Sequence, residues 1–435
     1  MLSPQKRLME DQSACSVPCV KGWLCIMRPT VWALLIILIV CIVTQVFVSH
    51  QPGFSAPPLL YWYSPSTGTS SPADLQTPAS SSLLRAETTC SPKTHLVFLK
   101  THKTASSTIL NILYRYGESR GLTFALPAKG HMQLFYPYFF AEHFVEGVKS
   151  QDVKEFHIMC SHMRFAKSAV AKVMPEDTFY FSILRHPLAM MESIYSYYKS
   201  IPVFRKTLSL DSFLDQNLRN QSSPVSRNNY AHNILAFDFG LENNATADSD
   251  DLEDRASAAI TAIERDFQLI LISEYFDESM ILLRHALCWS LEDVVYFKLN
   301  SRSDGSREPV LPSTAEKILR WNALDWRIYQ HFNSTFWQKV DRLMGEEQMK
   351  EEVSALRELQ AKLANICLKD DGAVHPSKIE DAQIRPYQSG KAVIQGYNLN
   401  PLTDPQTRDK CVRLVTPELQ YTKLLYDKQF PGFHN

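Results

Sequence analysis

Basic and hydroxyl side chains crowd into one short stretch of this sequence, KTHKTASST from Lys100 to Thr108. A strand-like apolar run precedes the stretch, and apolar residues at helical spacing follow it. Backbone N–H groups and the dipole at the start of a helix favour a phosphate or sulfate group. The stretch has no glycine and its lysine comes early, which argues against a GxxxxGK[ST] nucleoside triphosphate loop. It therefore predicts a loop that holds another kind of anion.

Short apolar runs alternate with helical patterns beyond Lys93, which predicts a parallel α/β sheet. The expected strands are residues 95–99, 155–160, 178–184 and 267–272. Further along, we expect helices at residues 313–330 and 351–366, then a loop-like tail from Arg385.

The segments that follow the four expected strands share basic and hydroxyl side chains. They are KTHKTASST, SHMRF, RHPLAMMES and SEYFDES. Ligands of an open parallel sheet bind outside the carboxyl ends of its strands. The net charge of −1 argues against a broad basic surface for nucleic acid, so the cations gather locally. The pattern predicts a binding site for an anion with several charged groups.

The motifs LKTHKTASST and ILRHPLAMMESIYSYY resemble the 5′- and 3′-phosphate-binding segments of sulfotransferases that use 3′-phosphoadenylyl sulfate (PAPS). With MCSHMRF, EYFDESMILLRHALCW, FKLNSRS, NALDWRIYQHFN, RPYQSGKAVIQGYNL and TPELQY, the chain resembles the Golgi galactose-3-O-sulfotransferases from about residue 95 to 421. The resemblance is greatest to members that act on β-galactosides of glycoproteins and oligosaccharides, rather than on galactosylceramide. It implies the sulfotransferase fold, a P-loop-like parallel sheet flanked by helices.

The resemblance also implies which residues hold the donor. Arg185 and Ser193 match the arginine and serine that hold the 3′-phosphate, and their spacing places both on one pocket if a helix follows Arg185. Ala105 stands where many sulfotransferases have glycine, which puts the backbone geometry of the loop in question. The 5′-phosphosulfate loop is expected to comprise Lys103, Thr104, Ala105, Ser106, Ser107 and Thr108.

Transfer to a sugar hydroxyl needs a base and stabilisation of the leaving oxygen. We expect His102 to be the base and Lys103 to stabilise the leaving nucleotide. His162 is a second candidate base or an acceptor-site donor, with a structural histidine as the alternative. Arg164 is expected to contact sugar or phosphate, and Glu274 to bind sugar hydroxyls or cap a helix. This scheme uses PAPS and no metal, and no cluster has zinc-ligand spacing.

The first part of the chain predicts a type II membrane protein. Val31–Val48 is an uncharged, mainly apolar run long enough to span a bilayer, and basic residues precede it but do not closely follow it. We expect a cytosolic tail (1–29), a transmembrane signal-anchor (30–49), a Pro- and Ser-rich stem (50–92) and a lumenal domain (93–435) in the Golgi. A cleavable signal peptide is the alternative for the apolar run.

A lumenal domain is expected to contain disulfides and N-glycosylation sequons. Cys367 and Cys411 are expected to form a disulfide, whereas Cys160 and Cys288 lie in apolar runs typical of buried thiols. The sequons begin at Asn220, Asn244 and Asn333.

Two other classes of protein remain open. A Golgi glycosyltransferase would share the anchor and stem but would normally carry a DxD-type motif, for which DSDD (Asp248–Asp251) is the nearest match. A lectin-like receptor would bind galactosides without transfer. The expected partners are β-galactoside-terminated glycans and the lipid bilayer, and a homodimer is left open.

Overall fold

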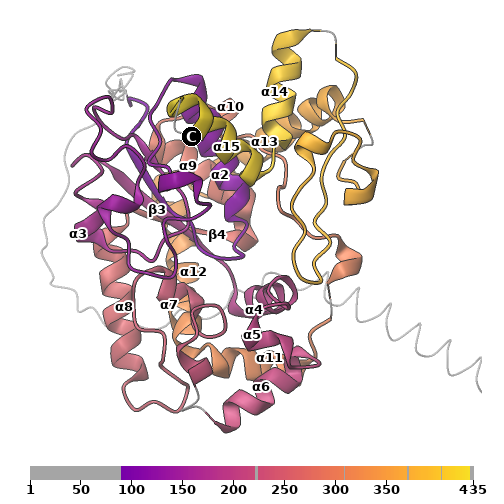
Figure 1. Ribbon diagram of the computed structural model, residues 1–435. Coiled ribbons are helices and arrows are strands. Elements are labelled where there is room, and N and C mark those ends of the chain that lie inside the picture. Colours follow the sequence, from indigo (N-terminus) through magenta and orange to yellow (C-terminus); the bar gives the residue numbers. More distant parts are fainter. Residues whose placement is uncertain (1–89, 221–223, 308, 370–371, 403, 432–435) are drawn as a thin grey trace, which may run out of the picture. The chain divides into compact units, whose positions relative to one another are not determined.

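A parallel sheet lies at the centre of the computed structural model, which describes residues 90–220, 224–307, 309–369, 372–402 and 404–431 (Figure 1). Within these residues, four strands pair in the order β2-β1-β3-β4, all in parallel. Their bounds are Leu96–Leu99 (β1), Ile158–Met159 (β2), Phe179–Leu184 (β3) and Leu269–Ile272 (β4). All four predicted strands are confirmed, and the apolar runs are buried because helices cover both faces of the sheet.

The strand order places a topological switch between β1 and β3. The chain leaves β1 toward β2 on one side of the sheet, and it leaves β3 toward β4 on the other. Such a switch opens a crevice outside the carboxyl ends of the two strands. The loops that begin at Lys100 and Arg185 therefore meet at this edge.

Helices surround the sheet. In the first half they are α2 (Ser106–Ser119), α3 (Lys167–Val170), α4 (Pro187–Tyr197), α5 (Pro202–Arg205), α6 (Leu210–Arg219), α7 (Ile234–Asp238) and α8 (Leu252–Asp266). In the second half they are α9 (Phe276–Leu287), α10 (Leu291–Val294), α11 (Pro312–Trp321), α12 (Ala323–Leu343), α13 (Glu346–Cys367), α14 (Pro405–Val415) and α15 (Glu418–Gln429).

The expectation of a loop-like tail from Arg385 is wrong in part. Residues 385–402 are irregular, but α14 and α15 follow and pack against α2. Asp404 caps α14 by accepting the Thr407 backbone N–H at 2.8 Å, and Pro405 fits the first helical turn. Since these helices cover α2, that helix is buried from Ser106 to Tyr114 rather than along one stripe.

The predicted helix at 313–330 is two helices. α11 ends at Trp321 and α12 begins at Ala323, with Asn322 between them outside the helical region (φ −106°, ψ 48°). The Asn322 side chain accepts the backbone N–H of Asn233 at 2.9 Å, which fixes the break against another part of the chain. The helix predicted at 351–366 is confirmed as part of α13.

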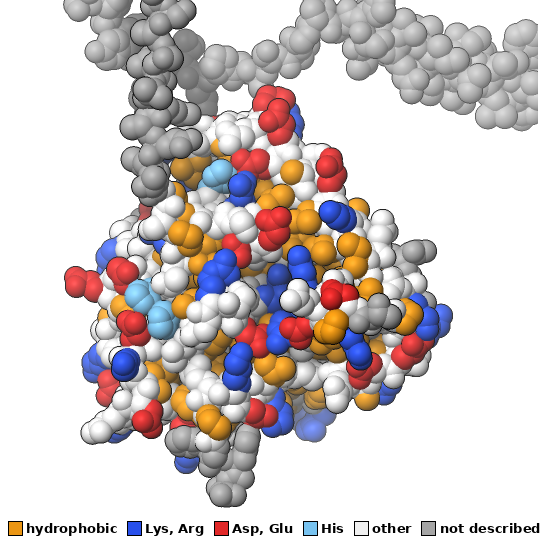
Figure 2. Space-filling model, turned by 90° about the horizontal axis from the view of Figure 1, so that it is seen from above, with side chains coloured by type: hydrophobic (Ala, Val, Ile, Leu, Met, Phe, Trp, Pro, Cys, Tyr) orange, Lys and Arg blue, Asp and Glu red, His pale blue; other side chains and the backbone are white. Residues whose placement is uncertain are grey.

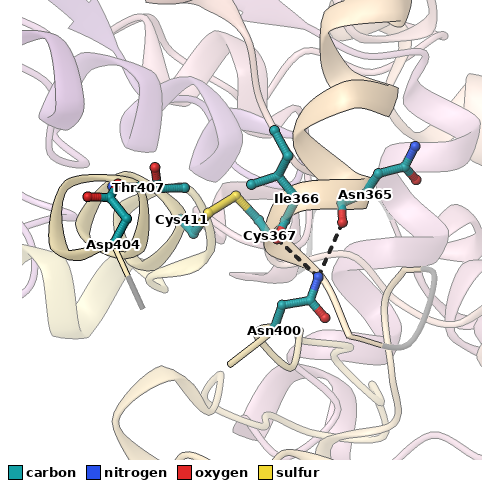
Figure 3. The surroundings of a disulfide bond; sticks show 7 residues. All are labelled: Asn365, Ile366, Cys367, Asn400, Asp404, Thr407 and Cys411. Carbon is teal, nitrogen blue, oxygen red and sulfur yellow. Dashed lines mark hydrogen bonds between the residues drawn. A yellow bond between two sulfur atoms is a disulfide. The ribbon is translucent and has the colours of Figure 1, made fainter. Parts of the chain in front are cut away.

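A disulfide links Cys367 at the end of α13 to Cys411 in α14, as predicted, with Cα atoms 5.3 Å apart (Figure 3). Beside it, the Asn400 amide donates to the carbonyls of Asn365 and Ile366, which are left without helical partners at the end of α13. The disulfide and Asn400 together fasten the carboxyl end of α13 to the segments that follow it.

A second disulfide corrects one prediction. Cys288 is not a buried thiol but is bonded to Cys90, with Cα atoms 5.7 Å apart. Cys90 precedes every apolar run of the domain, so its sequence context gave no sign of a partner. Among the described residues, Cys160 alone is a free thiol, and it is buried as expected.

The predicted membrane anchor and stem, residues 30–49 and 50–92, lie outside the described residues except at residues 90–92. From Cys90 onward, no described helix has the length and apolar character needed to cross a bilayer. The anchor therefore stays a prediction.

Candidate active site

A cleft of about 1070 Å³ opens at the carboxyl ends of the strands. The β1 and β3 loops form its floor, and α13 and α15 contribute to its walls. Figure 2 shows one face of the molecule, on which Lys and Arg side chains gather near the centre beside hydrophobic ones. The basic and imidazole groups that line the cleft are Lys100, His102, Lys103, His162, Arg185, Lys298, Arg302, Arg307 and Arg357.

The loop after β1 turns sharply into α2. Lys103 and Ala105 both have left-handed backbone conformations, with φ of 59° and 65°. Glycine adopts this region most readily, which gives a physical reason for the glycine that many sulfotransferases carry at the position of Ala105. The turn places Ala105 and the first residues of α2 in the lining of the cleft.

The hydroxyl groups of this loop hydrogen-bond within the loop and to two distant segments. Ser106 donates to the Thr101 carbonyl oxygen at 2.7 Å, and Thr104 donates to the same oxygen at 3.2 Å. Ser107 donates to Glu418 of α15 at 2.8 Å, and Thr108 accepts the backbone N–H of Leu299 at 3.1 Å. Ala105, Ser106, Ser107 and Thr108 line the cleft, whereas Thr104 lies beneath them.

Lys103 extends into the cleft and is surrounded by positive charge. Its ammonium lies 3.7 Å from the centroid of the Tyr197 ring. Desolvation, and then the cations Arg302, Lys100 and Arg185, lower the pKa of Lys103 to about 7. An anion in the cleft would relieve this repulsion, so the group is suited to a ligand with several negative charges.

Arg185 and Ser193 lie on the same cleft, as their spacing predicted. Arg185 leaves β3 and its guanidinium donates to the Lys103 carbonyl oxygen at 2.9 Å, joining the two loops. Ser193 lies in α4 and is buried. Next to it, Glu192 forms a buried, two-pronged ion pair with Arg302, which ties α4 to the segment after α10.

His102 is almost fully buried, at 1% exposure, beside the fully buried Asp238 at the end of α7. Its Nδ1 lies 3.0 Å from each Asp238 oxygen, and its backbone N–H donates to Oδ2 at 2.9 Å. Its Nε2 is buried and has no hydrogen-bond partner among the described residues. A buried polar atom without a partner is costly and points to a functional constraint.

His162 stacks on His102, with ring centroids 4.0 Å apart. Both of its nitrogens contact Lys100. Nδ1 lies 2.7 Å from the Lys100 carbonyl oxygen and must donate to it, so Nε2 accepts from the Lys100 ammonium at 2.8 Å. Desolvation, and then the neighbouring His102 and Lys100, hold the pKa of His162 well below its usual value. This geometry favours the structural alternative over a base.

Of the two residues expected to bind the acceptor, one lies outside the cleft lining and one lies in it. Arg164 is not part of the cleft lining, because its guanidinium stacks over the rings of Phe139 and Phe237 at 3.7 and 4.2 Å. Glu274 lines the cleft, but it accepts the backbone N–H of His186 at 3.0 Å, at the start of α4. It thus holds the segment that carries Arg185. The expected cap of its own helix α9 is not seen, since Tyr275 is the N-cap of α9 and no side chain caps it.

The sequon asparagines lie in different local structures. Asn220 is exposed just after α6. Asn244 is half-buried and accepts from Arg255 at 2.6 Å, and Asn333 lies within α12 and accepts from Tyr329 at 3.4 Å. Their modification stays a prediction.

The sequence-based reasoning missed several residues of the site. Lys100 and Arg302 belong to motifs already singled out, and basic residues at the ends of strands or beside a matched motif could have drawn attention to them. Glu418, which pairs with Lys100 at 3.2 Å, is about 300 positions away in the chain, so no local signal links them. Asp238 lies in an apolar run, ILAFDFG, that carries no recognisable motif.

The described residues contain one group with metal-ligand spacing, His95, Glu155 and His157, at the amino end of the sheet. His95 and His157 have Nε2 atoms 3.7 and 3.6 Å from the oxygens of Glu155. The Nδ1 of His157 accepts the backbone N–H of Thr123 at 3.2 Å, so the ring proton is on Nε2. A protonated nitrogen has no lone pair for a metal, and we assign no metal to this group.

Comparison with known proteins gives one consistent result. A family model described as galactose-3-O-sulfotransferase matches residues 27–429. The chain is 50% identical to galactose-3-O-sulfotransferase 2 from Homo sapiens over 344 residues, which cover 78% of this chain and 85% of that protein. It is 48% identical to the same-named protein from Sus scrofa, over 80% and 87% of the two chains. It is 38% identical to galactosylceramide sulfotransferase from Bos taurus, over 81% and 82%.

Proposed function

Because the chain belongs to the galactose-3-O-sulfotransferase family and is a sulfotransferase, we propose that it sulfates the 3-hydroxyl of terminal β-galactose with PAPS as donor. The single observation that carries the proposal is the cation-lined cleft at the switch between β1 and β3. The preferred acceptors are glycoprotein and oligosaccharide glycans, since the identity to galactose-3-O-sulfotransferase 2 exceeds that to galactosylceramide sulfotransferase.

The residues present suit such a donor. Lys103, with its pKa lowered by desolvation and by other cations, lies where an anion would restore its charge. Arg185 and Ser193 lie on the same cleft for the 3′-phosphate, and the start of α2 offers backbone N–H groups for the 5′ side. PAPS supplies the sulfuryl group, and the chain's own cations take over the charge neutralisation for which other enzymes use a metal.

In this proposal His102 is the base. Its Nδ1 contacts Asp238, so Nε2 carries the lone pair that accepts the proton of the acceptor hydroxyl. Lys103 stabilises the charge that develops on the leaving oxygen. Because Nε2 is covered in the free protein, the side chains over it must shift when the acceptor enters.

We also propose that the enzyme is a single-pass type II protein of the Golgi membrane, with residues 93–435 in the lumen. The apolar run at residues 31–48 and its flanking charges support this orientation. Disulfides persist in oxidising compartments, and the pairs Cys90–Cys288 and Cys367–Cys411 suit a lumenal domain.

A glycosyltransferase has less support. Asp248 pairs with Arg320 at 2.8 Å on the surface, and Asp248–Asp251 is absent from the cleft lining. The sequence motif that could have held a metal-bound sugar nucleotide is therefore not at the site.

The experiment is an assay of the purified full-length chain in detergent with PAPS or UDP-sugars. The acceptors are a panel of β-galactosides together with galactosylceramide, and the position of sulfate in each product is determined by mass spectrometry and NMR. We expect sulfate at the 3-hydroxyl of galactose, with oligosaccharides preferred to the lipid. Transfer from a UDP-sugar alone would overturn the proposal, and sulfate at another hydroxyl would overturn the assigned position.

A further inference from the structure

The Asp238 carboxylate contacts both the ring and the backbone of His102. Both residues are almost completely buried, and one carboxylate contacts the ring nitrogen and the backbone N–H of the same histidine. An ionised carboxylate accepts hydrogen bonds but cannot donate them. The proton of the neutral His102 ring must therefore be on Nδ1, which leaves Nε2 with the lone pair.

We propose that Asp238 is a positioning residue, which holds the His102 ring in the Nδ1–H tautomer and stabilises it when Nε2 takes a proton. The inference rests on the proposed role of His102 as base and explains why that residue would be competent. Without Asp238, Nδ1–H and Nε2–H forms would compete, and the imidazolium would form in a buried site without a counter-charge.

The fold fixes Asp238 through a second buried carboxylate. Asp325 of α12 accepts the backbone N–H groups of Leu235 and Ala236 at 3.0 and 2.9 Å, at the start of α7. Asp238 is the last residue of this five-residue helix. Asn233, immediately before α7, is held by the same segment between α11 and α12. Its backbone N–H donates to the Asn322 side chain, and its side-chain oxygen accepts the backbone N–H of Asp325. These contacts position the helix that carries Asp238.

The charged and titratable groups near Asp238 are few. His102 faces it from the β1 loop, His162 stacks on His102, and the rings of Tyr136, Tyr198 and Tyr230 lie near His102. Burial raises the pKa of each of these tyrosines, and the Asp238 charge adds to each shift. Asp325 is the other nearby carboxyl, and burial raises its pKa to about 7. None of these groups offers a second cation to Asp238.

An Asp238→Asn substitution tests the tautomer directly. The His102 backbone N–H needs an acceptor, so the amide oxygen should remain on it and the NH₂ group should face Nδ1. That arrangement reverses the tautomer and places the ring proton on Nε2. We expect kcat to fall on the order of 100-fold, with the donor Kd within about twofold of the unchanged chain. Asp248→Asn makes the same chemical change on the surface and should leave both values unchanged.

Two readouts separate positioning from a structural role. The rising limb of the kcat–pH profile should move to lower pH in Asp238→Asn, because the imidazolium has lost its neighbouring anion. A kcat within threefold of wild type, or a loss of donor binding in parallel with kcat, would overturn the proposal. Thermal unfolding of each full-length variant, measured beside donor binding, checks that the protein is folded.

A third readout does not need turnover. Deuterium exchange at the Cε1 carbon of His102, followed by mass spectrometry across pH, reports the titration of this ring alone. We expect its midpoint to be lower in Asp238→Asn, and an unchanged midpoint would contradict the inference. If the wild-type chain transfers no sulfate but the midpoint still moves, the proposed function fails while the pairing of Asp238 with His102 stands.

Discussion

Two pairs of histidine rings lie at opposite ends of the same sheet. At the amino end, His95 and His157 have centroids 5.1 Å apart, and at the carboxyl end His102 and His162 are 4.0 Å apart. The first pair is partly exposed among the carboxylates of Glu155 and Asp177. A pair of neighbouring histidine rings therefore does not by itself distinguish the candidate site from the amino end of the sheet.

The partners of each nitrogen make the difference. At the amino end, carboxylates face nitrogens of both rings, and water screens these exposed pairs. At the carboxyl end, Lys100 engages both nitrogens of His162, and Asp238 engages one of His102. Of the ring nitrogens in these two pairs, the Nε2 of His102 is the one that is buried without a hydrogen-bond partner among the described residues. The following predictions test this contrast, in order of decreasing effect.

His102→Ala should give the largest effect. Removal of a general base typically costs 10²–10⁴-fold in rate, so kcat should fall on the order of 10³-fold while the donor still binds. His95→Ala, the matched change at the amino end, should leave kcat within about twofold of wild type. Sulfate transfer and calorimetric donor binding measure both. Wild-type turnover in His102→Ala would remove the base assignment.

His162→Gln should lower kcat by about tenfold, because it removes or weakens one or two hydrogen bonds between His162 and Lys100. We expect the pH midpoint of kcat to stay in place, because His162 is not the titrating group in this scheme. His157→Gln is the control at the amino end. A loss as large as that of His102→Ala would instead identify His162 as a base.

Donor affinity should depend on pH through Lys103. Since its pKa in the free protein is lowered to about 7, the side chain is charged below pH 7 and loses its proton as pH rises through that value. Binding of an anionic donor should therefore weaken by up to about tenfold per pH unit above 7. Lys103→Gln should bind more weakly at pH 6 and lose most of this dependence. An equal pH dependence in Lys103→Gln would assign it to another group.

Ala105→Gly should give the smallest effect. Glycine relieves the cost of a left-handed backbone, about 1 kcal/mol, but it also gains freedom in the unfolded chain, so stability should change by less than about 1 kcal/mol. Ala105→Val should be clearly destabilising, because a β-branched residue tolerates this region poorly. Thermal unfolding measures both changes. A strong loss of stability in Ala105→Gly would show that the Cβ of Ala105 is needed.

Local patterns predicted the sheet and the anion-binding character of the β1 loop, because each depends on residues close together in the chain. The pair Arg185 and Ser193 came from the family resemblance, with which their spacing agrees. Asp238, Glu418 and the α7 anchor Asp325 act through contacts between distant segments. Glu418 and Asp325 lie in quoted motifs, but the motifs do not show which distant residue each contacts, and Asp238 lies in an apolar run outside every motif. Arg164 and Glu274 were singled out because they follow predicted strands, and the structure places only Glu274 in the cleft lining. Sequence spacing locates the cleft, and tertiary contacts decide which side chains face it.

The disulfide between Cys90 and Cys288 affects how the domain bears force. β1 begins six residues after Cys90 and leads straight into the loop with His102 and Lys103. A force applied from the N-terminal side acts first on Cys90, and the disulfide transmits it to Cys288 at the end of α9. The Lys93 backbone adds hydrogen bonds with Leu287 and Trp289 of the same segment. If the chain is anchored as proposed, this link would carry tension from the N-terminal side into α9 rather than along β1 to the loop with His102 and Lys103.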